Sequence, residues 1–379
     1  MNLEEVESYK RIDTSDMLSV LMKFPEDIWQ AYTTSKEIKI PSEVRIGSIN
    51  ISYGAPNGII ICGMGGSAIG GDLLKCLLID RSPLHVEVVR DYKLPAYASR
   101  DTLVIVVSYS GNTEEALSCF IDSIKRGCMS VAITSGGMLM DYARRLGIPI
   151  YEAPRGRAPR AAIAYLFLPL LGVLKRLGFN LVTDNEVNES VSVLRELREE
   201  IRPEVASEKN IAKDLAMKIN GLIPVIYAYR QYRAVAFRFK TQLNENSKYP
   251  AKVEELPELD HNEIVGWEID GDITKRFLAI VLKGGDEPQE IQVRFNITIE
   301  LIKDKVADVL ELKARGNGRL ARMLSLLYVC DFTSYYLALL NDIDPTPVRS
   351  IELLKKRLSD YGVALKRIKE DYKSLLFNY

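Results

Sequence analysis

The sequence is poor in cysteine and histidine. Its five cysteines show no CxxC or other metal-ligand spacing, and its two histidines, His85 and His261, lie far apart without an HxH or HExxH pairing. The composition therefore excludes a disulfide framework and the usual zinc sites. We expect the cysteines to be small buried residues in a reducing compartment, and we expect neither a metal nor a cofactor.

The chain also lacks an excess of either charge and a long apolar run. Its 379 residues carry 50 Lys and Arg against 51 Asp and Glu, so bulk electrostatics favour neither nucleic acid nor a membrane surface as a partner. The longest apolar stretch, residues 161–174, contains Pro169 and is shorter than the ~20 residues that span a bilayer. The acidic N-terminus has no signal-peptide core. We expect a cytoplasmic protein.

What the sequence does have is a repeated alternation of β-branched runs with helical patterns. The expected strands lie at residues 58–62, 86–89, 102–107, 130–134 and 148–154, and again at 221–229, 277–282 and 307–314. Continuous rather than alternating apolar strands indicate parallel sheets that are covered on both faces.

We therefore predict an α/β fold with two doubly wound domains, each a parallel sheet flanked by helices. The expected divisions are a helical lead-in at residues 1–50, a first domain at 51–184, a second at 185–356 and a helical tail at 357–379. Doubly wound sheets bind ligands at the carboxyl ends of their strands, so the loops at those ends are the candidate binding segments.

The first such loop is "CGMGGSAIGG", residues 62–71, which has five glycines in ten residues. A relaxed GxGxxG/A pattern, with Asp91 about 20 residues further on, fits a dinucleotide site. The same loop also suits a sugar phosphate, in which case Gly65, Gly66 and Ser67 are the residues that contact the ligand.

A second loop, "SYSGNTEEA", follows the strand at 102–107 and favours the sugar phosphate. Ser108, Ser110 and Thr113 place three hydroxyls at the start of a helix, where free backbone N–H groups and the helix dipole attract an anion. A dinucleotide fold does not need this loop. The structural alternative is that these residues only cap the helix.

Together the two loops resemble those of the SIS (sugar isomerase) fold, which enclose the phosphate of a phosphosugar. Six segments occur in the order found in the bifunctional phosphoglucose/phosphomannose isomerases of archaea and some bacteria: "GMGGSAIGGDLL", "VSYSGNTEEAL", "PRAAIAYLF", "QLNENSK", "ELDHNEIVGWE" and "DPTPVRSIELLK". The resemblance covers about residues 50–358. It implies a metal-free homodimer with shared active sites that interconverts glucose, fructose and mannose 6-phosphates through a cis-enediol.

Aldose–ketose isomerisation needs a group that opens the sugar ring and a base that moves a proton between C1 and C2. His261 lies in the turn "ELDHNEI", where we expect its ring to face a cleft, whereas His85 begins a strand and should be packed or capping. Glu245 ends an apolar helix, near the core, where desolvation increases the proton affinity of a carboxylate. The resemblance assigns ring opening to His261 of the neighbouring subunit and the proton transfer to Glu245.

The reaction also needs a cation that faces the enediolate oxygen. Arg160 opens the apolar helix "AAIAYLF", where a positive charge is unfavourable for the helix dipole and so has another purpose. A simple basic turn that includes Arg155 and Arg157 is the structural alternative. The match of "PRAAIAY" to the family favours Arg160.

The last segment, "DPTPVRSIELLK", adds two candidates. Lys355 resembles a lysine that approaches the substrate in these isomerases, although Lys356 is one position further and a lysine pair on a helix is usually solvated. Thr346 stands where conventional phosphoglucose isomerases carry glutamine, and a smaller residue suits both C2 epimers.

Two other functions compete with this interpretation. A non-catalytic phosphosugar-binding regulator on the same fold would keep the serine loops but would have no use for Glu245 and His261. A nicotinamide-dependent dehydrogenase would use the glycine loop but not the serine loop.

Overall fold

The computed structural model describes residues 2–269 and 271–377, and the chain forms two compact units. Unit 1 contains Met1–Pro25 and Asp184–Pro347, and unit 2 contains Glu26–Thr183 and Val348–Tyr379. These divisions differ from the predicted ones at both chain ends: the lead-in at 1–50 is split between the units, and the C-terminal helices pack with the first α/β half.

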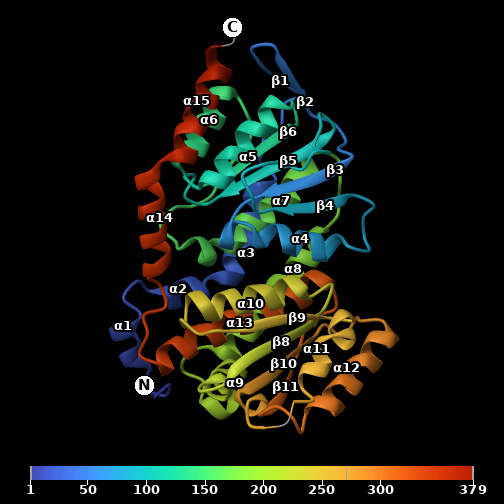
Figure 1. Ribbon diagram of the computed structural model, residues 1–379, viewed down its shortest axis with the longest axis vertical. Coiled ribbons are helices and arrows are strands. Elements are labelled where there is room, and N and C mark those ends of the chain that lie inside the picture. Colours follow the sequence, from blue (N-terminus) through green and yellow to red (C-terminus); the bar gives the residue numbers. More distant parts are fainter. Residues whose placement is uncertain (1, 270, 378–379) are drawn as a thin grey trace. The chain divides into compact units, whose positions relative to one another are not determined.

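Unit 2 is built on a five-stranded, wholly parallel sheet (Figure 1), in the order β4-β3-β5-β6-β7. Every residue of the central strand β5 is buried, as the continuous apolar run predicted. The strands are β3 (Gly58–Cys62), β4 (His85–Val89), β5 (Thr102–Ser108), β6 (Met129–Thr134) and β7 (Ile150–Glu152). The flanking helices are α4 (Ile69–Leu78), α5 (Glu114–Lys125), α6 (Gly137–Leu146) and α7 (Ile163–Arg176).

The C-terminal helices α14 (Arg349–Tyr361) and α15 (Val363–Phe377) also belong to unit 2. The buried residues Ile368, Tyr372 and Leu375 form an apolar stripe at helical spacing on α15. The ring of Tyr372 stacks on that of Tyr142 with 3.6 Å between their centroids. This packing, rather than a free tail, explains why the end of the chain joins this unit.

A small hairpin precedes the sheet, where the sequence predicted helix and irregular structure. Strands β1 (Glu43–Ile46) and β2 (Ile49–Ser52) pair antiparallel, and Gly47 adopts a φ of +56° in the turn between them. The prediction was wrong here because each strand has only four residues, too few for an alternation to stand out.

Unit 1 repeats the parallel arrangement with four strands in the order β11-β10-β8-β9. The strands are β8 (Ile223–Tyr229), β9 (Lys252–Leu256), β10 (Phe277–Lys283) and β11 (Asp308–Lys313). Three were predicted; β9 was missed because its sequence, KVEEL, has no continuous apolar run. The two parallel sheets confirm the predicted α/β class.

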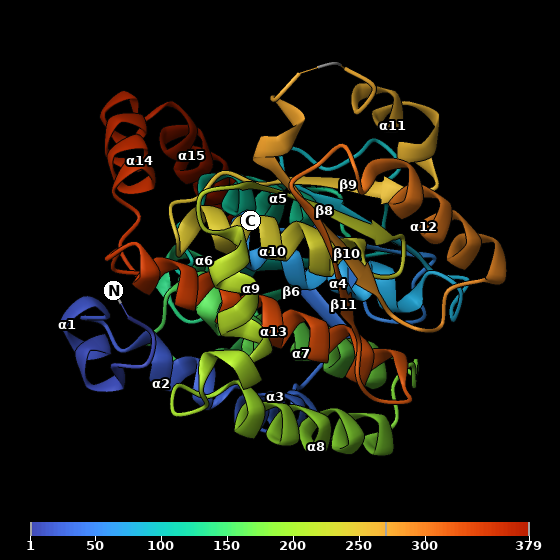
Figure 2. The ribbon, with the colours of Figure 1, turned by 90° about the horizontal axis from the view of Figure 1, so that it is seen from below.

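Helices cover both faces of this second sheet, as Figure 2 shows for α12 and α13. The helices are α8 (Asp184–Ile201), α9 (Ile211–Ile219), α10 (Arg233–Glu245), α11 (Glu263–Gly266), α12 (Gln289–Ile302) and α13 (Arg319–Leu340). Among the described residues, α13 is the one helix long and apolar enough to cross a membrane, and 94% of its most apolar window is buried inside the protein. It is the core helix of this unit.

The N-terminal helices α1 (Tyr9–Ile12) and α2 (Met17–Met22) pack in unit 1. The Tyr328 hydroxyl of α13 donates a 2.9 Å hydrogen bond to the Leu21 carbonyl. The fully buried Lys213 donates to the Leu3 carbonyl at 2.9 Å. These long-range contacts fix residues 1–25 to a part of the chain that begins far away in sequence.

All five cysteines are free and buried, as predicted. Burial raises the pKa of the Cys128 thiol to about 11. A hydrogen bond with Cys119, together with burial, raises the pKa of Cys62. Thiols held in the protonated form are poor nucleophiles and poor metal ligands, so these side chains act as core residues.

Candidate functional site

The glycine loop after β3 passes directly over the backbone that begins α7. A Cβ atom on Gly66 would lie 2.7 Å from the Arg160 nitrogen and 2.8 Å from its Cα, so only glycine permits this approach. The loop forms the 3₁₀ turn η2 (Gly65–Ser67), and Arg160 lies in a second such turn, η3 (Pro159–Ala162). The Arg160 side chain is buried, and it precedes α7 rather than opening it.

A hydrogen bond joins the glycine loop to the serine loop. The Tyr109 backbone N–H donates to the Ser67 hydroxyl at 3.1 Å. Both loops follow neighbouring strands, β3 and β5, at the carboxyl edge of the sheet where ligands bind in doubly wound folds. The structure thus brings Gly65, Gly66 and Ser67 together with the loop of Ser108.

Within the serine loop, the hydroxyls bond to one another and to the loop's own backbone. The buried Ser108 hydroxyl donates to the Thr113 hydroxyl at 3.1 Å and accepts from the Gly111 N–H at 3.2 Å. Thr113 occupies the N-cap position of α5 but makes no side-chain capping bond, so helix capping does not account for its hydroxyl. The Ser110 hydroxyl accepts from the Asn112 N–H at 3.3 Å and is exposed.

The two arginines that precede Arg160 have local partners. Arg157 forms an ion pair with Asp27, and the Tyr165 hydroxyl donates to the same carboxylate at 2.9 Å. Burial and the Asp27 charge raise the pKa of Tyr165, which keeps that hydroxyl protonated as a donor. Arg155 donates to the Ser135 carbonyl at 2.8 Å. Structural contacts therefore explain both of these side chains.

In unit 1, the loops that follow β10 and β11 have their backbone N–H groups occupied by carboxylates of the protein itself. Glu287 accepts hydrogen bonds from the backbone of Gly284 and, at 2.8 Å, of Gly285, just before α12. Glu189 accepts from the Gly318 N–H at 3.1 Å, at the N-terminus of α13. A carboxylate that occupies backbone donors competes with a bound anion at the same place. This arrangement distinguishes unit 1 from the hydroxyl-lined loops of unit 2.

Glu245 and Thr346 lie on neighbouring segments of unit 1. Glu245 is the last residue of α10 and is partly buried. The Lys248 ammonium donates to the Glu245 carbonyl at 2.7 Å and to the Asp344 carbonyl at 3.1 Å. The Thr346 N–H in turn donates to the Asp344 carboxylate at 2.9 Å. The helix end that carries the predicted base is thereby tied to the loop that carries Thr346.

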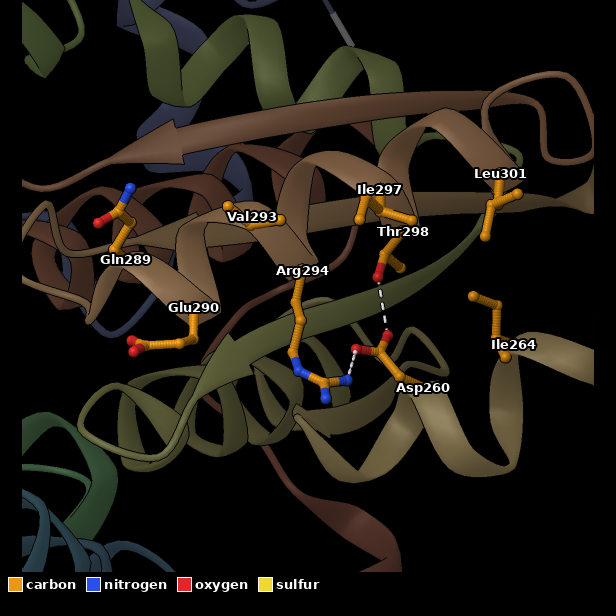
Figure 3. A pocket seen from close by; sticks show the side chains of 9 residues that line it. All are labelled: Asp260, Ile264, Gln289, Glu290, Val293, Arg294, Ile297, Thr298 and Leu301. Atoms are coloured by element: carbon orange, nitrogen blue, oxygen red, sulfur yellow. Dashed lines mark hydrogen bonds and ion pairs between the residues drawn. The ribbon is translucent and has the colours of Figure 1, made fainter.

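His261 ends the 3₁₀ turn η5 (Glu258–His261), and its side chain is exposed. The adjacent Asp260 forms a 3.0 Å ion pair with Arg294 and accepts a 2.7 Å hydrogen bond from Thr298, both on α12 (Figure 3). These residues border an open groove of about 690 Å³ on unit 1. Its apolar lining consists of Ile264, Val293, Ile297 and Leu301.

The remaining predicted residues lie on exposed surfaces. Lys355 and Lys356 are both exposed on α14, so burial does not distinguish which of the two lysines approaches the substrate. His85 was expected to be packed or capping, and that expectation is wrong: its side chain is exposed, with Nε2 3.6 Å from a Glu87 carboxylate oxygen. His85 is the first residue of β4, and its side chain is left uncovered there, whereas Val86 and Val89 of the same strand are buried.

Sequence reasoning missed the role of Lys248 in this part of unit 1. The residue stands at the end of "QLNENSK", so the segment itself was noticed, but only its glutamate was given a purpose. A lysine whose ammonium binds main-chain carbonyls leaves no compositional signal, because its partners depend on the path of a loop almost a hundred residues away.

Comparison with known proteins identifies the family of this chain. Residues 208–358 match the model of the bacterial phospho-glucose isomerase C-terminal SIS domain. Over 91% of this chain and 99% of the relative, the sequence is 42% identical to a bifunctional phosphoglucose/phosphomannose isomerase of Caldicellulosiruptor bescii. A protein of the same name from Aquifex aeolicus is 38% identical over 80% of this chain and 91% of its own.

A solved structure shares the fold. It is a glucose-6-phosphate isomerase like protein from Thermus thermophilus, with a TM-score of 0.57 and 17% sequence identity. The superposition covers 92% of this chain and 98% of that one. At this identity the likeness concerns the fold alone, and it agrees with the two parallel sheets described above.

Proposed function

The chain belongs to the family of bifunctional phosphoglucose/phosphomannose isomerases, and from this premise we propose that it interconverts glucose 6-phosphate and mannose 6-phosphate with fructose 6-phosphate. The observation that carries the proposal is the identity to such a protein across almost its whole length. Two chemical features also support it: the glycine and serine loops suit a phosphate, and the glutamate at the end of α10 suits a base.

In this proposal the loops of unit 2 hold the substrate's phosphate. Ser67, Ser108, Ser110 and Thr113 supply hydroxyl donors, and the N-terminus of α5 adds a favourable dipole for a dianion. Gly65 leaves room for the ligand because a Cβ there would meet no atom within 4 Å, and Gly66 contributes its backbone because it lets the loop pass close to Arg160. The phosphate fixes one end of the sugar, so that its carbonyl end is presented in one orientation.

The chemical steps need one base and one ring-opening group. His261 moves the proton that opens the sugar ring, and Glu245 takes the proton from C2 of the aldose and returns it to C1. Each such positioned group contributes about 10²- to 10⁴-fold in rate. Arg160 stabilises the negative charge on the enediolate oxygen, and Lys355 approaches the substrate from α14.

The enediol explains why one site serves two epimers. Glucose and mannose 6-phosphates differ only in the configuration of C2, and C2 is planar in the enediol. The reverse reaction therefore makes either epimer, according to the face of C2 that receives the proton. Thr346 leaves space beside C2 for both configurations, as a larger side chain would not.

The test of this mechanism is the variant Glu245→Gln. It removes the proton acceptor while it keeps the size of the side chain, so we expect at least about 10²-fold loss of isomerisation with an unchanged unfolding temperature. The measurement is the rate at which fructose 6-phosphate is converted, in a coupled assay of purified protein.

Glu196→Gln is the matched control, because Glu196 is an exposed glutamate on α8 and its variant should keep wild-type turnover. Near wild-type turnover in Glu245→Gln would overturn the assignment of the base. If the wild-type chain binds fructose 6-phosphate without converting it, the protein is a phosphosugar-binding regulator instead.

We further propose that two copies of the chain form a dimer in which each supplies His261 to the partner's active site. The exposed position of His261 supports this, because a side chain that points to solvent can reach a neighbouring molecule. The groove beside it is bordered by exposed apolar residues of α12, Val293, Ile297 and Leu301. An apolar row on one helix can pack against its own copy about a two-fold axis.

Mixing two inactive variants tests the shared site. In a dimer of His261→Asn with Glu245→Gln, one site keeps both functional residues and the other has neither. Random exchange of subunits should restore about a quarter of wild-type activity, since half of the dimers are mixed and each regains one of its two sites. No restored activity, with subunit exchange demonstrated by mass spectrometry, would show that each chain uses its own histidine.

A further inference from the structure

The segment "QLNENSK" carries polar residues around Glu245 whose roles the proposed function leaves open. One of them, Lys248, has a left-handed backbone with φ +55°. Such a conformation is uncommon for a residue with a side chain. It is typical of the position just after a helix, where the chain turns away, and it directs the Lys248 side chain back toward the end of α10.

The Lys248 ammonium binds main-chain oxygens from two separate segments. Its donor–acceptor distances are 2.7 Å to the carbonyl of Glu245, 3.3 Å to that of Asn246, 3.1 Å to that of Asp344 and 3.5 Å to that of Pro345. The first two carbonyls belong to the C-terminal end of α10, where a positive charge is favourable for the helix dipole. The other two belong to the loop just before Thr346.

Hydrogen bonds between buried polar residues hold this end of α10 against the core helix α13. The Asn246 amide donates to the Ser334 hydroxyl at 2.9 Å, and the Ser247 hydroxyl donates to the Ser334 carbonyl at 2.6 Å. Two turns earlier, Arg238 and Asp331 form a buried ion pair with 2.6 Å between nitrogen and oxygen. The helix is thus anchored to α13, and the Lys248 ammonium links the same end of α10 to the loop at 344–346.

We propose that Lys248 is a positioning residue that holds the Glu245 end of α10 and the Thr346 loop at a fixed separation. The inference rests on the proposed function, in which Glu245 transfers the proton and the Thr346 loop borders C2. Without the bridge, the loop loses this link to the end of α10, and the distance between the carboxylate and the substrate carbon is held less tightly. A misplacement of about 1 Å can reduce a rate about 100-fold.

The experiment compares Lys248→Met with Lys248→Arg and with Lys240→Met. Methionine keeps much of the length but loses the charge and the donors, and arginine keeps both. Lys240 lies on α10 itself, with its ammonium 5.6 Å from the centre of the Phe237 ring. We expect Lys248→Met to lower kcat by about ten- to a hundredfold with little change in KM. Lys248→Arg should recover most of that loss, and Lys240→Met should resemble the wild type.

Lys248→Gly is a second variant that keeps the test decisive if Lys248→Met does not fold. Glycine adopts a positive φ without strain, so this variant should fold normally and still lose kcat like Lys248→Met. An unchanged kcat in Lys248→Met or Lys248→Gly would overturn the proposal. A rise in KM alone would also overturn it, because that result would show a contact with the substrate rather than positioning.

Hydrogen exchange separates this proposal from the proposed function. The backbone amides of Asp344, Thr346 and Val348 should exchange faster in Lys248→Met than in the wild type or in Lys240→Met, whether or not sugar phosphate is turned over. Equal exchange in all three would show that Lys248 does not hold the loop. A wild-type chain that does not convert fructose 6-phosphate would instead refute the proposed function, and with it the catalytic purpose of the bridge.

Discussion

At the scale of single residues, the proposed chemistry depends on hydroxyls for binding and on a carboxylate for the proton. Ser67 shows the difference most clearly. It is buried, its oxygen accepts the Tyr109 N–H, and its own proton can be donated to a phosphate. A hydrogen bond to a charged group contributes about 1.5–3 kcal/mol, which acts on substrate and transition state alike because the phosphate does not react.

Ser67→Ala should therefore raise KM by about ten- to a hundredfold, with a much smaller change in kcat. Steady-state kinetics with fructose 6-phosphate measure both constants. Ser118→Ala is the matched control, because Ser118 is a partly buried serine on α5 that donates to the Tyr92 carbonyl. A fall in kcat at unchanged KM would place Ser67 among the groups that act on the reacting carbon.

Single residues also show how far sequence reasoning reaches. The serine and glycine loops could be predicted because their residue types are unusual and lie close together in the chain. His85 was misjudged because the exposure of the first residue of a strand depends on what packs over it in the fold, which no local pattern states. Lys248 was missed because its partners at 344–345 become neighbours only in the fold.

At the scale of elements, the close contact between η2 and η3 controls where Arg160 lies. The Gly66 position has no room for a methyl group, since a Cβ would meet the Arg160 backbone at 2.7 Å. Backbone atoms cannot rotate away as a flexible side chain can, so an added methyl must push the two turns apart.

Gly66→Ala should therefore lower the free energy of unfolding by about 1–3 kcal/mol and reduce turnover as Arg160 shifts. Urea unfolding and the coupled assay are the two measurements. Gly54→Ala is the control, because its Cβ would meet no atom within 4 Å and the variant should behave like the wild type. Equal stability and activity in both variants would contradict the described contact.

Elements were predicted well where burial is continuous and poorly where it is not. The wholly buried strand β5 was found from its apolar run. Strand β9 is only partly buried, and the hairpin of β1 and β2 is short, so neither gave a pattern distinct from a loop.

At the scale of the whole molecule, the chain passes from one unit to the other three times, after Pro25, Thr183 and Pro347. The boundary after Thr183 lies where the composition changes, one residue before the division expected after residue 184. The other two could not be predicted, because apolar stripes such as that of α15 indicate that a helix is covered but do not indicate which sheet covers it.

The proposed dimer gives a prediction at the same scale. Ile297→Asp places a charge in the apolar row of α12, where a partner would bury it, and burial of an unpaired charge costs several kcal/mol. The variant should be a monomer in light scattering and should lose turnover, since it no longer receives His261 from a partner.

Met217→Asp is the control, because Met217 is a comparably exposed apolar residue on α9 and lies outside the groove. It should remain a dimer with wild-type activity. A dimeric Ile297→Asp would place the interface on another surface, and a monomeric but fully active one would show that the site is complete within a single chain.

The central claim, that one protein isomerises both epimers, is tested most directly by a single time course. Purified wild-type protein is given fructose 6-phosphate alone, and glucose 6-phosphate and mannose 6-phosphate are measured separately in the same samples. The account predicts that both appear from the start of the reaction and approach an equilibrium mixture. Formation of neither product, or of one epimer without the other, would contradict it.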